Sequence, residues 1–181
     1  TSTLNVNNST VTLNDAPNGG NIYLSGDSGL INVFSSTIAA SQNGVGLFTE
    51  GDSFTLGNTI VGLNADGACG GDGSFQSGGN NLLQNVGDCD YDPDDSDILN
   101  EDPLLGDLED NGGPTRTHAL MPGSPAIDNG DSDFAIDQRG FDRDDDDDDI
   151  GAFEFGAGPV ASEDGPGDGT DGLDETAMPD G

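Results

Sequence analysis

Short segments in which apolar and polar residues alternate recur along the first hundred residues of the chain. In each segment two apolar residues are separated by a single residue, which is Asn, Thr or Tyr, as in Leu4 and Val6, Val11 and Leu13, Ile22 and Leu24, Ile31 and Val33, and Phe54 and Leu56. A period of two residues predicts short β-strands with one buried face. No segment shows the 3.6-residue period of an amphipathic helix, so the pattern predicts an all-β protein.

The predicted strands also repeat at a regular interval. Thr10, Thr37 and Thr59 each precede a β-branched apolar residue and lie 27 and 22 residues apart. Gly19 and Gly44, 25 residues apart, each lie three residues before an aliphatic–aromatic pair. A repeat of this length indicates a solenoid whose coils stack their strands in parallel, with Gly and Asn at the corners where φ is positive. We predict a right-handed parallel β-helix.

The residue composition of the sequence divides the chain into three parts. Residues 1–100 carry the predicted coils, and within them residues 64–100 are expected to form an excursion from the regular pattern. Residues 101–155 are richer in Pro and turns and are expected to cover the C-terminal end of the β-helix as a capping module. Residues 156–181, composed mostly of Gly, Asp, Glu and Pro, are expected to be a flexible acidic linker or tail.

The N-terminal end of the predicted solenoid has no polar cap. The strand pattern begins at Thr1, and a terminal coil without a cover exposes core side chains and unpaired backbone groups. We therefore expect this end to be covered by further coils or by another copy of the chain. Head-to-tail contacts that do not close produce filaments.

Cys69 and Cys89 are the only cysteines. In a chain with the character of an exported protein, such a pair predicts a disulfide, although two buried thiols are the alternative. Closing a loop of this length stabilises the fold by about 3 kcal/mol. No stretch is apolar for long enough to span a membrane, and the expected location is extracellular or at the cell surface.

The charge of the chain excludes several classes of partner. Its 36 acidic residues face three Arg and no Lys, which gives a formal net charge of −33 at pH 7. Nucleic acids, anionic membranes and acidic polysaccharides are poor partners, because binding them requires cations. The acidity has two explanations, a solvated surface suited to salty, halophilic conditions or the binding of divalent cations.

Calcium is the one cofactor that the sequence suggests, and none is required by any pattern. Asp88, Asp90, Asp92 and Asp94 alternate along the chain and offer the hard oxygen ligands that calcium prefers. However, Pro93 stands where a calcium-binding loop has Gly.

Catalytic residues of β-helix enzymes have no clear counterpart. A lyase site needs a basic residue beside carboxylates, yet all the Arg residues lie after residue 100, at Arg116, Arg139 and Arg143. The single histidine, His118, has no catalytic neighbours in sequence and is expected to be a strand residue. We predict that the chain is not an enzyme.

The part of the chain after residue 101 contains a series of distinctive sequence motifs. They are Asp102-Pro103-Leu104-Leu105-Gly106, Asp110-Asn111-Gly112-Gly113-Pro114-Thr115-Arg116-Thr117-His118-Ala119-Leu120, Pro122-Gly123-Ser124-Pro125-Ala126-Ile127-Asp128, Asp137-Gln138-Arg139-Gly140 and Asp149-Ile150-Gly151-Ala152-Phe153-Glu154. This series resembles the end of the choice-of-anchor Q domain proteins. The resemblance implies a bacterial surface protein with a right-handed parallel β-helix related in shape to pectate lyases. The acidic run from Asp144 to Asp149 departs from the family pattern: Asp149 keeps its place, but five further Asp precede it.

Arg139 is one of few cations in an acidic chain, and we expect it to form a structural ion pair with a carboxylate such as Asp128, Asp137 or Glu154. The leading functional expectation is a structural or adhesive role, in which the long faces of the solenoid contact surface glycans, proteins or other copies of the chain. Two alternatives are a fragment of a carbohydrate-active β-helix protein and a calcium-responsive assembly protein.

Overall fold

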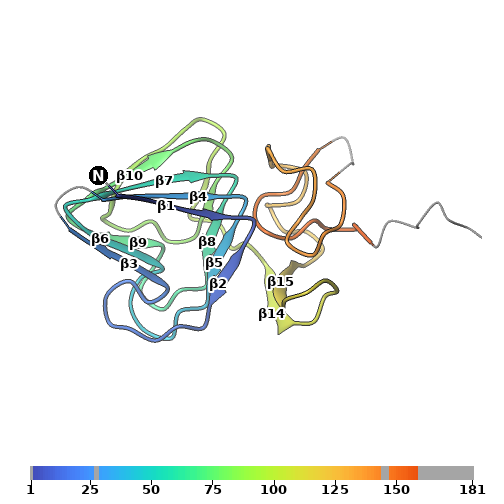
Figure 1. Cartoon of the computed structure of the whole chain (residues 1–181), viewed down its shortest axis with the longest axis horizontal. Coiled ribbons are helices and arrows are strands. Elements are labelled where there is room, and N and C mark those ends of the chain that lie inside the picture. The colour runs from blue at the N-terminus through green and yellow to red at the C-terminus, as the bar shows by residue number, and fades with distance from the viewer. Residues whose placement is uncertain (1, 27–28, 144–146, 159–181) are drawn as a thin grey trace, which may run out of the picture.

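The computed structural model describes residues 2–26, 29–143 and 147–158, and every regular element in these ranges is a β-strand. Three parallel sheets stack the coils (Figure 1). Sheet A contains β1 (Ser2–Asn7), β4 (Gly29–Phe34), β7 (Ser53–Gly57), β10 (Ser74–Ser77) and β12 (Asp90–Asp92). Sheet B contains β2 (Thr10–Thr12), β5 (Thr37–Ala39), β8 (Ile60–Gly62), β11 (Leu82–Leu83) and β13 (Ile98–Leu99). Sheet C contains β3 (Ile22–Ser25), β6 (Leu47–Glu50) and β9 (Cys69–Gly71). The predicted all-β parallel solenoid is therefore confirmed.

The register of sheet A follows the apolar alternation of the sequence. Leu4 lies opposite Ile31, Ile31 opposite Phe54, and Phe54 opposite Phe75. The rings of Phe54 and Phe75 stack with their centroids 5.2 Å apart, and both side chains are fully buried. Burying one such side chain contributes about 2 kcal/mol, so this column forms the centre of the solenoid core. The other fully buried residues of this core are Val33, Ile38, Leu47, Leu56, Val61, Ala68 and Leu83.

The expected alignment of the threonine repeats is wrong by one residue at the third coil. Thr37 lies opposite Ile60, not Thr59. The Thr59 hydroxyl instead donates to the carbonyls of Val33 and Gly57, as the Ser36 hydroxyl donates to that of Phe34. Thr59 therefore occupies the corner before the strand, where its polar group stabilises the turn.

A column of residues with positive φ forms the corner between sheets A and B. We call Asn8, Ser35, Asn58 and Asn80 the corner column; their φ values are 47°, 46°, 47° and 52°. Asn adopts this left-handed conformation more readily than most residues, because its short amide bonds locally. The repeated geometry lets each coil turn at the same place.

The residues that follow the corner column bond one coil to the next inside the protein. The Thr59 N–H donates to Asn81 Oδ1 (3.1 Å), and the Asn81 N–H donates to Asp97 Oδ1 (2.9 Å). The Asn81 amide also donates to the carbonyl of Leu56 (3.0 Å). Asn81 is fully buried, and these bonds satisfy groups that would otherwise be desolvated without a partner.

Residues 64–100 do not leave the regular coils as expected. They contain β9 to β13, which continue all three sheets. The expected disulfide is present and joins Cys69 of β9 to Cys89, just before β12, with a Cα–Cα distance of 5.7 Å. The coil is shorter here: only 16 residues separate Phe75 from its pairing partner Tyr91. The disulfide closes this shorter coil.

The end module, whose described residues are 101–143 and 147–158, begins with the antiparallel hairpin of β14 (Leu105–Glu109) and β15 (Thr117–Leu120) and continues in turns. The module lies beside β2, β5 and β8, on the outer face of sheet B (Figure 1). A second apolar core joins Ile60 and Leu82 of sheet B to a set of module residues, namely Leu120, Ala126, Ile150 and Phe153. The module therefore lies along the flank of the solenoid, whereas we had expected it to cover the C-terminal end.

The two ends of sheet A differ in their exposed strands. The N-terminal edge strand β1 is neutral, and its Leu4 is 53% exposed. The C-terminal edge strand β12 is short and carries the exposed acids Asp90 and Asp92, which disfavour edge pairing. Covering of the N-terminal end by another copy stays a prediction. Residues 159–181 of the predicted tail lie outside the described residues, and no helix in the described ranges is long and apolar enough to cross a membrane.

The phenol of Tyr91 gives a prediction for the last coil. Its hydroxyl donates to Asp97 Oδ2 (2.7 Å), and burial is the main cause that raises the pKa of Tyr91 above its ordinary value. We expect Tyr91→Phe to lower the free energy of unfolding by about 1 kcal/mol at neutral pH, because Asp97 loses a hydrogen bond.

Because the pKa of Tyr91 is higher in the folded state, its contribution is present below about pH 10 and is lost as the pH rises through the folded value. The difference between wild type and Tyr91→Phe should therefore shrink by roughly 1 kcal/mol from neutral pH to about pH 11, with allowance for partial exposure. Urea unfolding at both pH values measures it. A difference that does not change with pH would show that the phenol is not held neutral by the fold.

Candidate functional site

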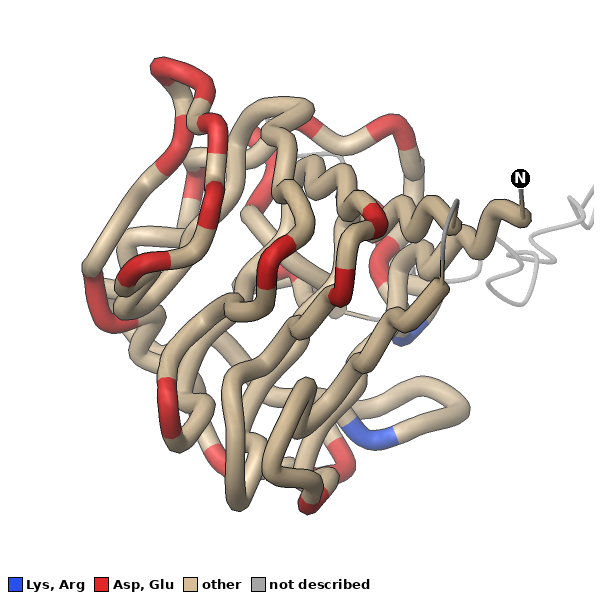
Figure 2. The backbone as a smooth tube through the Cα atoms, turned by 90° about the vertical axis from the view of Figure 1, so that its left-hand side faces the viewer, with Lys and Arg blue, Asp and Glu red and all other residues tan. Residues whose placement is uncertain are grey.

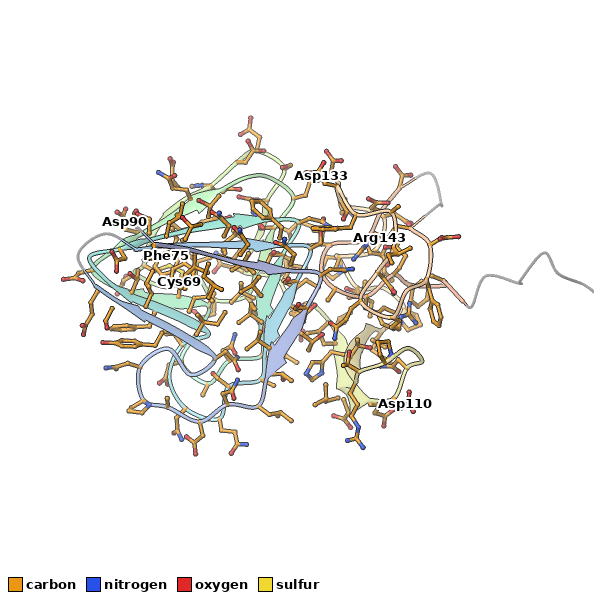
Figure 3. The ribbon with its side chains drawn as sticks, in the orientation of Figure 1. Cys69, Phe75, Asp90, Asp110, Asp133 and Arg143 are labelled. Carbon is orange, nitrogen blue, oxygen red and sulfur yellow. A yellow bond between two sulfur atoms is a disulfide. The ribbon has the colours of Figure 1, made fainter. Side chains whose placement is uncertain are left out.

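Five charged side chains are buried together in the end module. They are Asp137, Arg139, Arg143, Asp149 and Glu154, and none is more than 7% exposed. Buried charges are stable only when they are paired and hydrogen-bonded, so this cluster must be internally satisfied. Figure 3 shows Arg143 inside the module.

Arg139 pairs with Asp137 at 2.7 Å through its Nε. Its Nη2 donates to the backbone carbonyl of Glu154 (2.5 Å). The guanidinium also lies over the rings of Phe153 and Phe141, with its Cζ 3.7 and 4.5 Å from their centroids. Arg139 therefore forms the expected structural ion pair and at the same time fixes the two aromatic rings.

The Glu154 carboxylate belongs to Arg143, which corrects the expected pairing with Arg139. Arg143 Nη1 lies 2.6 Å from Glu154 Oε2, and its Nη2 donates to the carbonyl of Gly151 (2.6 Å). Asp128 is not a partner of Arg139 either. It is exposed, at a turn position with a φ of 57°, and it takes part in neither ion pair of the buried cluster.

Asp149, at the end of the acidic run, has a structural role. Its Oδ1 accepts from the Asp128 N–H (2.9 Å), and its Oδ2 accepts from the Phe155 N–H. It is only 1% exposed, so this member of the run is not part of the solvated acidic surface. Residues 144–146 of the run lie outside the described residues.

The module is fastened to the solenoid through the corner column. Asn8 Nδ2 donates to the Ile136 carbonyl (3.0 Å), and Asn80 Nδ2 donates to the Asn129 carbonyl (3.1 Å). The hydroxyls of Ser35 and Ser132 lie 2.8 Å apart. One side chain from each of these coils thus holds the module in place.

Asn58 is the most heavily used member of the corner column. Its Oδ1 accepts from the Asp131 N–H (3.1 Å), and its Nδ2 donates to the Asp149 carbonyl (3.1 Å). Its own carbonyl accepts from the Gly151 N–H (2.9 Å). Gly151 fits here because its φ of 105° is one that side-chain-bearing residues rarely adopt, and a Cβ would also lie 2.9 Å from Ile60 Cδ1. Asn58 joins the buried charges to the sheet corner.

His118 lies in β15 and is 4% exposed. Its Nδ1 donates to the Gly106 carbonyl (2.8 Å), and its Nε2 lies 2.8 Å from the Thr12 hydroxyl. His118 therefore stands in a strand, as expected, and both ring nitrogens bond to the surrounding fold. Whether the chain lacks enzymatic activity stays a prediction.

The four aspartates of the proposed calcium motif do not converge. Asp90 and Asp92 lie on the exposed face of β12, and Asp88 is exposed before it. Asp94 accepts from the N–H and hydroxyl of Ser96, and these bonds lower its pKa. Within the described ranges, no three or more His, Cys, Asp or Glu side chains are placed to hold a metal ion. Calcium binding by the chain stays a prediction.

A cavity of about 250 Å³ opens where sheet A meets the end module. Its lining combines aromatic, amide, carboxylate and glycine residues, namely Asn7, Phe34, Ser35, Gly57, Asn58, Gly78, Gly79, Asn80, Asp131, Asp133 and Phe134. No sequence pattern indicates this site, because Phe34 and Phe134 are far apart in the chain and only the docking of the module brings them together.

Comparisons with protein-family models, with curated proteins and with solved structures find no match for this chain. The resemblance to the choice-of-anchor Q domain proteins therefore stays an interpretation of the sequence phrases.

The buried cluster predicts a large difference between two arginines. Arg143→Ala leaves Glu154 buried without its cation, and we expect the free energy of unfolding to fall by about 3–5 kcal/mol. Arg116→Ala is the matched control, because Arg116 is exposed, and a surface substitution changes stability by less than about 0.5 kcal/mol.

Urea or thermal unfolding of the two variants measures this difference. The double variant Arg143→Met with Glu154→Gln should recover part of the loss, because it removes both buried charges. Equal stability of the Arg143 and Arg116 variants would contradict the buried ion pair.

Proposed function

We propose that the chain is a non-catalytic structural or adhesive β-helix segment of an extracellular or cell-surface protein. The observation that carries this proposal is the location of the three arginine side chains. Arg139 and Arg143 are buried in the end module, and Arg116 alone of the three arginines is exposed. The coils themselves present acidic residues and no cation (Figure 2). A site that clamps an acidic polymer for cleavage would need accessible positive charge.

The outer face of sheet A has the chemistry of a contact surface for uncharged partners. Asn5, Asn32, Thr55 and Gln76 lie side by side on successive strands. Asn32 Nδ2 donates to Asn5 Oδ1 (2.8 Å), which orders this part of the row. Amides and hydroxyls both donate and accept hydrogen bonds, so such a row suits neutral polar ligands.

The rigidity of the fold supports a structural role. The disulfide between Cys69 and Cys89 fixes the last complete coil, and the end module holds the flank of sheet B. Disulfides persist in oxidising surroundings, which agrees with export. The sequence resemblance to bacterial surface proteins with parallel β-helices supports the same location.

Surface labelling of the source cells tests the proposal. An antibody against the folded chain should bind intact cells or their secreted fraction, and external protease should remove the cell-bound signal. The purified chain should release neither unsaturated nor reducing sugar from a panel of polysaccharides. A protein confined to the cytoplasm, or turnover of a polysaccharide at ordinary enzyme rates of about 1 per second or more, would contradict the proposal.

A further inference from the structure

On its sheet A side, the cavity between sheet A and the end module is lined by an aromatic ring and by glycines. Phe34 of β4 is half-buried and lies across the neighbouring strands at Gly57 and Gly78. A Cβ at Gly57 would lie 2.6 Å from the Phe34 ring, and one at Gly78 would lie 3.6 Å from it. Because these two glycines have no side chains, the Phe34 ring packs against their backbone, and no side chain from either position fills the cavity.

The opposite wall belongs to the end module. Phe134 is half-buried, and the neighbouring Asp131 and Asp133 are exposed at the rim. Figure 3 shows Asp133 where the module adjoins the solenoid. The loop keeps this position because Asp131 and Ser132 bond to Asn58 and Ser35 of the corner column. The cavity is therefore built by the docked fold.

These groups match the surface of a sugar ring. A neutral sugar presents apolar C–H groups on its faces, which pack on aromatic rings, and hydroxyls around its edge, which donate to carboxylates. The volume of about 250 Å³ is below that of pockets for drug-sized ligands and suits a single ring. A uronic acid would bring its own carboxylate against Asp131 and Asp133 and would be repelled.

We propose that this cavity binds a neutral sugar residue of a surface glycan. The inference rests on the proposed adhesive function and gives it a ligand class. The row of Asn5, Asn32, Thr55 and Gln76 lies on the same outer face of sheet A as Phe34, because these residues alternate with the buried ones. The rest of the glycan lies along this row.

The test uses the full chain labelled with ¹⁵N and titrated with methyl glycosides of glucose, galactose, mannose and galacturonic acid. At least one neutral glycoside should shift the amide signals of Gly79, Asn80 and Phe134, with a Kd of about 1 mM. The galacturonide should bind at least about tenfold more weakly.

Two variants and a control assign the binding to the cavity. Phe134→Ala should weaken binding about tenfold, and Asp133→Asn, which changes only an exposed group, about threefold. Tyr23→Ala is the matched control: it removes an exposed aromatic ring that stacks on Phe48 in sheet C, and binding should not change.

The inference is overturned if no neutral glycoside shifts the cavity signals up to about 50 mM, far above the expected Kd. It is also overturned if both cavity variants bind like wild type, or if the galacturonide binds equally well. The surface-labelling experiment gives an independent result. A surface protein without sugar-induced shifts would remove only this inference, whereas a cytoplasmic protein would remove the proposed adhesive function.

Discussion

The corner column is the feature on which the rest of the structure depends. Asn8, Ser35, Asn58 and Asn80 turn each coil from sheet A into sheet B with positive φ, and their side chains point to the end module and bond to it. Asn at three of these four positions meets two demands, since it tolerates this backbone conformation and also carries a donor and an acceptor. The repeat that winds the solenoid therefore also creates the strip on which the module docks.

Sheet B explains why the docking is required. Its residues alternate between the solenoid core, with Val61 and Leu83, and the outer face, with Ile60 and Leu82. A parallel sheet that is apolar on both faces must be covered on both. The module supplies the cover, and the buried pairs of Arg139 with Asp137 and of Arg143 with Glu154 hold its turns in place where it has few strands.

Much of the solenoid could be predicted from the sequence, because a period of two residues and a coil repeat are local patterns. The disulfide followed from the only two cysteines, Cys69 and Cys89. The position of the module could not be predicted, because nothing local distinguishes Ile60 and Leu82, which contact the module, from Val61 and Leu83, which face the solenoid core. The partner of Arg139 was ambiguous for a similar reason: with many acids, only the fold selects Asp137. The cavity joins Phe34 to Phe134, and no sequence pattern links them.

The module and sheet B form one cooperative unit that is held together by the corner column. Native-state hydrogen exchange of the full chain, measured by NMR at increasing denaturant, tests it most directly. The amides of Ile150 and Gly151, which donate to Ala126 and Asn58, should exchange only with the same global opening as the amides of Ile60 and Leu82 in sheet B. Exchange of Ile150 and Gly151 through an opening of much lower free energy, with a smaller denaturant dependence than global unfolding, would show that the module opens by itself and would contradict this cooperativity.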